Sequence, residues 1–147
     1  MTLAKTANQS TVTVSGHKVE MHKGGSGPAL LFLHGGGGFG TFDPTNSALS
    51  ERFTVYAPSH PGFFGTERPS WLYTINDVAH FYKDLVAELG LGDYVLVGHS
   101  VGGWIAAEMA AMDHHNIKGL VLIDAAGVRP EKGEITEIFM VSGDTRL

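Results

Sequence analysis

Ser100 is the residue whose type and surroundings best fit nucleophilic catalysis. It lies at the centre of Gly98-His99-Ser100-Val101-Gly102, between an apolar run at 94–97 and a helical pattern at 102–112. A serine raised above a sheet on a sharp strand-to-helix turn needs strained backbone angles and neighbours without Cβ atoms. A helix N-terminus at that point would favour developing negative charge. The pattern predicts a nucleophile; the alternative is a glycine-rich connection with an incidental serine.

A second glycine-rich segment, His34-Gly35-Gly36-Gly37-Gly38-Phe39-Gly40, directly follows an apolar run. Acyl transfer requires preorganised N–H donors for an oxyanion, and glycines let the backbone approach the reacting carbonyl. A phosphate-binding loop is the alternative. However, the segment has no Gly-Lys-Ser/Thr ending and runs on into Phe42-Asp43-Pro44 instead of opening a helix with G-x-G-x-x-G. The sequence therefore predicts an oxyanion loop.

Composition limits the other chemistries that this chain could perform. Its 147 residues are 43% hydrophobic and 17% charged, which predicts a single globular domain over residues 1–147. The net charge of −5 does not suit nucleic-acid binding, and the absence of cysteine excludes thiolate catalysis and disulfides. No signal-like segment or apolar span of ~18 residues is present. We expect a cytoplasmic protein that uses no metal or organic cofactor and binds neither nucleic acid nor membrane.

Short apolar runs alternate with helical periodicity, which is typical of an α/β architecture with parallel strands. Residues 23–28 have the composition of a loop. Thr74 and Asp77 have the spacing of a capping box, and Gly90 suits the C-terminal end of the same helix. The pattern predicts strands at 11–15, 18–22, 29–33, 53–57, 94–97 and 118–123, and helices at 45–51, 74–89 and 102–112.

Four motifs in this order resemble the α/β-hydrolase superfamily, in particular its esterase, C–C hydrolase and haloalkane-dehalogenase-like group. They are Leu33-His34-Gly35-Gly36, His60-Pro61-Gly62-Phe63, Gly98-His99-Ser100-Val101-Gly102-Gly103 and Leu120-Val121-Leu122-Ile123-Asp124. The resemblance implies a truncated α/β-hydrolase fold: a mostly parallel sheet with helices on both faces, lacking the last strands and the lid. Residues 125–147 would be a remnant of the lid or tail. Dehalogenation is not expected, because that chemistry normally uses an aspartate where Ser100 stands.

The same resemblance assigns further site residues. The oxyanion donors would be the backbone N–H groups of Val101 and of Gly36 or Gly37, and His34 would orient their loop. Asp124 ends a predicted strand at the same sheet edge as Ser100, where some members of the family keep the acid of the triad. Its alternative role is to cap a loop.

By this resemblance the general base would be a histidine on a loop after later strands. We expect it to be absent from this chain, which stops before those strands. Among the eight histidines, only His60 lies on a loop at the edge of the sheet that carries Ser100. A histidine from a partner chain is the other candidate. His99 adjoins Ser100 but would point away from it.

These residues together predict a serine hydrolase that acts on small carboxylic esters. Ser100 would attack the carbonyl and form an acyl-enzyme, while the N–H groups of Gly36 and Val101 hold the oxyanion. The alternative is a non-catalytic α/β-hydrolase-like half-domain that dimerises or binds a ligand. Aromatic residues that could line an acyl pocket are Phe39, Phe42, Phe63, Phe64 and Trp104.

The last strand, from Lys118 to Ile123, predicts how the chain assembles. In the family this strand is interior, whereas here its apolar edge would be unpaired and prone to pairing with another strand. We therefore expect a homodimer. Either the two strand edges pair across a twofold axis, or the tail from Glu134 to Leu147 exchanges between protomers.

Overall fold

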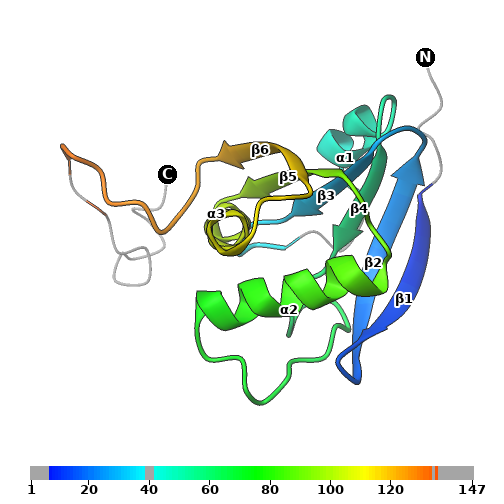
Figure 1. Cartoon of the computed structure of the whole chain (residues 1–147), viewed down its shortest axis with the longest axis horizontal. Helices are drawn as coiled ribbons and strands as arrows, with labels where there is room; N and C mark the ends of the chain where they lie inside the picture. Colours follow the sequence, from blue (N-terminus) through cyan, green and yellow to red (C-terminus); the bar gives the residue numbers. More distant parts are fainter. Residues whose placement is uncertain (1–6, 39–41, 134, 136–147) are drawn as a thin grey trace, which may run out of the picture.

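One mixed sheet carries the six strands found in the described part of the chain (Figure 1). The structure is a computed structural model that describes residues 7–38, 42–133 and 135. The strand order is β1-β2-β4-β3-β5-β6, in which β3 to β6 run parallel and β1 and β2 are antiparallel additions at one edge. The strands are β1 (Asn8–Val14), β2 (His17–Gly25), β3 (Ala29–Leu33), β4 (Thr54–Pro58), β5 (Tyr94–His99) and β6 (Ile117–Ile123).

The β1–β2 hairpin turns at Ser15 and Gly16, whose φ angles of 48° and 81° match the positive-φ turns that suit the twist of paired strands. The prediction of a loop over residues 23–28 is wrong for its first half, because β2 continues to Gly25 and pairs there with β4. Gly25 has a φ of 84°, and a Cβ at this position would collide with the backbone of Ser50 and Phe53. The glycines that predicted a loop here therefore belong to β2, where Gly25 allows the backbone of neighbouring segments to approach closely.

Helices cover both faces of the sheet, as expected. α2 (Ile75–Glu88) and α3 (Val101–Met112) pack against each other on one face, and the short α1 (Pro44–Leu49) contacts β2 and β4 (Figure 1). Strand side chains alternate between two buried clusters because successive residues point to opposite faces. Leu31, Leu33 and Leu96 belong to the cluster with α2 and α3, and Leu30, Phe32 and Val97 to the cluster with Leu49 of α1.

The predicted capping box at the start of α2 is confirmed. The Asp77 N–H donates to Thr74 Oγ1 at 3.1 Å, and the Thr74 N–H donates to Asp77 Oδ2 at 2.8 Å. These bonds favour the ionised carboxylate, so the backbone N–H groups of Thr74 and Tyr73 hold the pKa of Asp77 below its ordinary value. Gly90 follows the helix with a φ of 61°, the left-handed conformation expected at this end.

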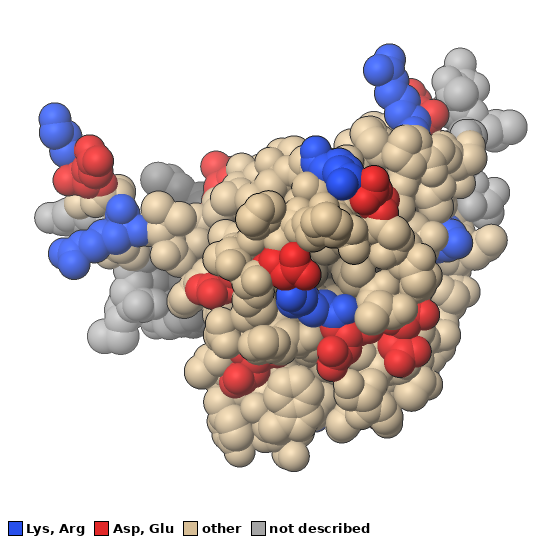
Figure 2. Space-filling model, in the orientation of Figure 1, with Lys and Arg blue, Asp and Glu red and all other residues tan. Residues whose placement is uncertain are grey.

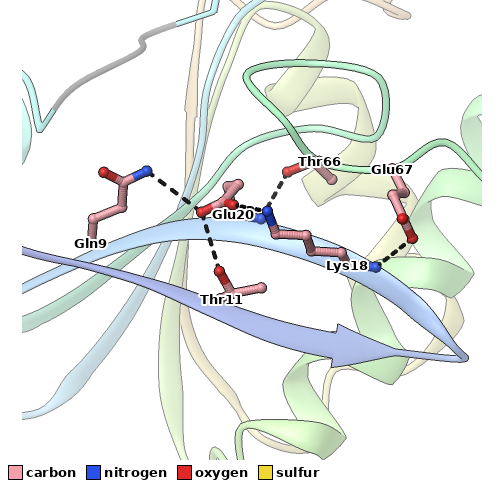
Figure 3. Close-up of polar contacts among 6 residues, drawn as sticks. All are labelled: Gln9, Thr11, Lys18, Glu20, Thr66 and Glu67. Carbon is pink, nitrogen blue, oxygen red and sulfur yellow. Dashed lines mark hydrogen bonds and ion pairs between the residues drawn. The ribbon is translucent and has the colours of Figure 1, made fainter.

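The loop after β4 is anchored along β2 by backbone and side-chain hydrogen bonds (Figure 3). Glu20 donates its N–H to Thr66 Oγ1 at 2.9 Å and accepts from the Ser59 N–H at 2.8 Å. Lys18 exchanges bonds with Glu67, and its ammonium forms an ion pair with Glu20. The Lys18 ammonium also holds the pKa of Glu20 below its ordinary value. These hydrogen bonds to β2 therefore hold the loop that carries His60 in place along one side.

Charged side chains of both signs are interspersed on the face shown in Figure 2. The sheet ends at β6, where four successive apolar residues, Leu120 to Ile123, are 37–46% exposed. No helix among the described residues has the length and apolar character needed to cross a membrane.

Candidate active site

Ser100 occupies the turn between β5 and α3 with φ 54° and ψ −120°, an uncommon conformation for a residue with a Cβ. Such a conformation costs about 1–3 kcal/mol and persists only where its surroundings impose it. Here, the Ser100 N–H donates to the Ile123 carbonyl at 2.9 Å. Its own carbonyl accepts from the Ala126 N–H at 3.0 Å and the Gly103 N–H at 2.9 Å. The turn, half-buried and at the head of α3, has the geometry that the sequence predicts for a nucleophile.

The glycines around Ser100 are required by close backbone approach. A Cβ on Gly102 would meet the Leu33 carbonyl and lie 2.5 Å from the His34 carbonyl oxygen. A Cβ on Gly103 would lie 2.7 Å from the Cβ of Ala125. Real Cβ atoms essentially never approach other atoms closer than 3.0 Å. The head of α3 therefore packs directly on the carboxyl end of β3 and on the loop after β6.

The glycine-rich loop after β3 reaches Ser100. A Cβ on Gly35 would lie 3.3 Å from the Ser100 Cβ and 2.8 Å from His99 Nδ1. Only a glycine allows the loop to lie this close to both residues. The structure thus brings together two motifs that are 65 positions apart in the sequence.

The expected oxyanion donors lie on the loop and at the first residue of α3. The Gly38 N–H donates to the Gly35 carbonyl at 2.9 Å, which closes a turn with Gly36 and Gly37 exposed at its corners. No acceptor among the described residues takes the N–H of Gly36, Gly37 or Val101. These three backbone N–H groups are therefore unengaged by the part of the chain that the structure describes.

A buried chain of hydrogen bonds runs behind this loop from α2. The Tyr82 hydroxyl lies 2.6 Å from His60 Nδ1, and His60 Nε2 lies 2.6 Å from the His34 carbonyl. The His60 N–H donates to His34 Nε2 at 2.9 Å, and His34 Nδ1 lies 2.7 Å from the Gly35 carbonyl. Because a carbonyl only accepts, we assign Nε2–H to His60 and Nδ1–H to His34, and the Tyr82 hydroxyl donates.

These contacts argue against His60 as the general base. Burial, helped by the neighbouring His34, lowers the pKa of His60 to about 3, so its imidazole is neutral near pH 7. Both ring nitrogens are already engaged, by Tyr82 and by the His34 carbonyl. Burial likewise lowers the pKa of His34 and raises that of Tyr82. The expectation that His60 contributes a base is not supported; it is a buried structural residue.

Asp124 lies in the loop that holds the Ser100 backbone, with a φ of 43° and an exposed side chain. Its neighbours Ile123 and Ala126 bond to Ser100, whereas the Asp124 carboxylate accepts no hydrogen bond from the described residues. All eight histidines are described, and none bonds to the Ser100 hydroxyl or to this carboxylate. Among the described residues, therefore, Asp124 makes neither the triad contact nor the capping contact considered for it.

The aromatic residues considered for an acyl pocket are dispersed. A Cβ on Gly38 would touch Phe63 and Phe64, so these rings flank the glycine-rich loop after β3. Phe42 instead packs into the cluster near α1, on the other face of the sheet. Trp104 lies against Gly127, and Phe39 lies outside the described residues.

Tyr82 is the site-related residue that sequence reasoning missed. It falls within the helix predicted at 74–89 but is not among the predicted site residues. A fully buried tyrosine usually finds a partner for its hydroxyl, and this is the signal that points to a polar contact. Within the described ranges, no group of three or more His, Asp or Glu residues is placed to hold a metal ion. The chemistry that this arrangement suits is nucleophilic attack with backbone stabilisation of an anion.

Comparison with known proteins identifies the family. A family model described as alpha/beta hydrolase fold matches residues 28–141. The chain is 36% identical over 101 residues to 2-(acetamidomethylene)succinate hydrolase of Mesorhizobium japonicum, covering 68% of this chain and 36% of that protein. It is 35% identical over 107 residues to haloalkane dehalogenase 2 of Mycobacterium bovis, covering 67% and 35%.

A solved structure described as a membrane phospholipase A, a bacterial virulence factor, superposes with a TM-score of 0.77. Its sequence identity is 32%, and the match covers 86% of this chain and 42% of that one. The chain thus spans about a third of the length of the curated relatives named above. With the turn at Ser100, the glycine loop and the sheet order, these matches show that the chain belongs to the alpha/beta hydrolase fold family.

Proposed function

We propose that this chain carries the nucleophile and oxyanion hole of a serine hydrolase that acts on small carboxylic esters. Ser100 Oγ attacks the ester carbonyl, its proton passes to a base, and the alkoxide leaves to give an acyl-enzyme that water hydrolyses. The N–H groups of Val101 and of Gly36 or Gly37 stabilise the oxyanion. Asp124 is proposed as the acid that orients a histidine not contributed by the described residues.

The single observation that carries this proposal is the position of the glycine loop against Ser100. A Cβ on Gly35 would lie 3.3 Å from the Ser100 Cβ, and the neighbouring N–H groups have no acceptor among the described residues. A purely structural turn has no need for a strained serine beside several unengaged donors. The arrangement suits a ligand carbonyl that accepts from both segments.

A fluorophosphonate probe tests the nucleophile, with imidazole added as an external base because no histidine hydrogen-bonds to the Ser100 hydroxyl. Attack forms an Oγ–P bond and breaks the P–F bond; fluoride leaves and imidazole takes the hydroxyl proton. We expect one adduct by intact mass, mapped to the peptide that contains Ser100. Ser100→Ala should not react, whereas Ser26→Ala, which removes an exposed serine on the loop after β2, should react like the unmodified chain.

Two outcomes would contradict the assignment. One is an adduct that persists in Ser100→Ala. The other is an unmodified chain that stays unlabelled while folded and supplied with imidazole. Turnover of a p-nitrophenyl ester that is lost in Ser100→Ala alone would support esterase chemistry over the non-catalytic alternative.

We also propose that β6 pairs antiparallel with β6 of a second copy. Four successive apolar residues are exposed on this strand, from Leu120 to Ile123. Lys118, the cation that could repel another copy, is already paired with Asp93 at 3.1 Å. An uncharged apolar edge is a template for another strand, and two copies can satisfy it symmetrically.

Sedimentation at micromolar concentration tests this assembly. Val121→Lys places a charge on the edge strand and should give a monomer. Ser10→Lys, at an exposed position on β1 at the opposite edge of the sheet, should sediment as a dimer like the unmodified chain. A monomeric unmodified chain would refute the proposal. The alternative exchange of the segment from Glu134 to Leu147 involves residues that lie almost entirely outside the described ones.

A further inference from the structure

The Gly35 carbonyl is held from two directions behind the oxyanion loop. It accepts from His34 Nδ1–H at 2.7 Å and from the Gly38 N–H at 2.9 Å. A carbonyl oxygen has two lone pairs, so both of its acceptor positions are filled. This peptide plane has little freedom to rotate.

The same peptide plane carries the N–H of Gly36. In a planar trans peptide the C=O and the following N–H point in opposite directions. Fixing the Gly35 carbonyl toward His34 and Gly38 therefore fixes the direction of the Gly36 N–H. Hydrogen bonding to the carbonyl also polarises the peptide and strengthens the N–H as a donor.

His34 is itself held by His60. The His60 backbone N–H donates to His34 Nε2 at 2.9 Å, which leaves Nδ1–H as the proton that His34 can give to Gly35. The His60 side chain donates Nε2–H to the His34 carbonyl at 2.6 Å. The two histidine rings also lie 3.7 Å apart between centroids. Both the tautomer and the orientation of His34 therefore depend on His60.

Tyr82 completes the chain from α2. Its hydroxyl donates to His60 Nδ1 at 2.6 Å and is fully buried, so no solvent competes for the bond. Without this donor, His60 Nδ1 would be buried without a partner. Tyr82 lies in the cluster that packs α2 against the sheet, which makes the donor rigid.

We propose that Tyr82 and His60 are positioning residues that act through His34 to aim the Gly36 N–H at the oxyanion. This inference rests on the proposed function for its effect on reactivity, while the hydrogen-bond chain can be tested separately. Neither residue touches the substrate. Their role is to keep one donor peptide in a single orientation.

The first test compares Tyr82→Phe with Tyr94→Phe. Tyr94 is a buried tyrosine of the same cluster, but it begins β5 and so lies at the opposite end of that strand from Ser100. Circular dichroism first identifies conditions in which both variants are fully folded. Since loss of one oxyanion donor costs about 10²–10³ in rate, a misaligned donor should slow labelling of Ser100 about tenfold in Tyr82→Phe. Tyr94→Phe should react within twofold of the unmodified chain; equal rates in both folded variants would overturn the proposal.

Two variants at position 60 separate positioning from packing. The amide N–H of Gln in His60→Gln can replace the Nε2–H donor to the His34 carbonyl. The shorter amide of His60→Asn can still place an acceptor for Tyr82 near the position of Nδ1, but its N–H falls short of the His34 carbonyl. The expected order of labelling rates is unmodified chain, His60→Gln, then His60→Asn. The reverse order of the two variants would contradict a role through His34.

Imidazole ¹⁵N spectra test the chain without any reactivity. Neutral His34 should be the Nδ1–H tautomer and His60 the Nε2–H tautomer, and in Tyr82→Phe the His60 Nδ1 resonance should move toward that of an unbonded nitrogen. An Nε2–H tautomer at His34 would overturn the inference whether or not Ser100 reacts. The expected tautomers in a chain that never labels would refute the proposed function and leave the hydrogen-bond chain established.

Discussion

Replacing Gly102 by alanine tests whether the turn at Ser100 depends on close packing of α3 against β3. The added Cβ would meet the carbonyl oxygens of Leu33 and His34, the latter at 2.5 Å. Both are backbone atoms at the end of a central strand, so no side-chain rotation can relieve the contact. The His34 oxygen would have to retreat to at least 3.0 Å, and with it the peptide that begins the glycine-rich loop after β3.

The expected destabilisation follows from two opposing effects. Alanine in a helix is favoured over glycine by roughly 0.5–1 kcal/mol. Overpacking a well-packed site costs typically about 1–3 kcal/mol, and contacts with two fixed backbone oxygens place Gly102→Ala at the upper end. The net loss should be about 2 kcal/mol. With a urea dependence of about 1–3 kcal/mol per molar, the unfolding midpoint should fall by about 1 M.

Gly92→Ala is the matched control. Gly92 is exposed in the connection between α2 and β5, and a Cβ there would meet no atom within 4 Å. Its free energy of unfolding should stay within about 0.5 kcal/mol of that of the unmodified chain or rise slightly. Urea titrations followed by circular dichroism measure all three proteins. Equal midpoints for Gly102→Ala and the unmodified chain would refute the close contact and the geometry derived from it.

Three further predictions follow from the backbone, the buried histidines and the helix cap. Ser100→Gly should be more stable than Ser100→Ala by about 1 kcal/mol in urea unfolding, because relief of about 1–3 kcal/mol of strain outweighs about 0.5–1 kcal/mol of chain entropy; the opposite order would contradict the strained turn. The folded pKa of His60, about 3, lies below the ordinary 6.5, so stability should be lost as pH falls below 6.5, by up to about 1.4 kcal/mol per pH unit from this residue. The loss between pH 6.5 and 5 should be smaller in His60→Gln, and an equal loss would show that His60 is not buried as a neutral group. Thr74→Ala should lower the free energy of unfolding by about 1 kcal/mol in thermal melts, and an unchanged melt would mean that the cap does not stabilise α2.

The sequence by itself predicted the features that depend on neighbouring residues. The turn at Ser100, the capping box at Thr74 and the left-handed residue at Gly90 were all recognisable. Each of these features depends on the backbone angles of a few neighbouring residues. Those angles require glycine or a small polar residue at a fixed spacing, and this pattern is visible in the sequence. The apolar runs likewise located the strands to within a few residues, except where β2 continues to Gly25.

The tertiary structure decided what each of the more distant residues does. His60 shares a sheet edge with Ser100, which favoured a catalytic interpretation, yet its ring is buried between Tyr82 and His34. These partners are 22 and 26 positions away. The sequence shows that position 60 is a histidine, which can exchange a proton. Burial and the two hydrogen bonds of its ring decide whether it does. The packing of α2 against the sheet supplies the bond from Tyr82, and the residue that follows β3 supplies the bond to the His34 carbonyl. Together these contacts make a candidate base a buried neutral residue.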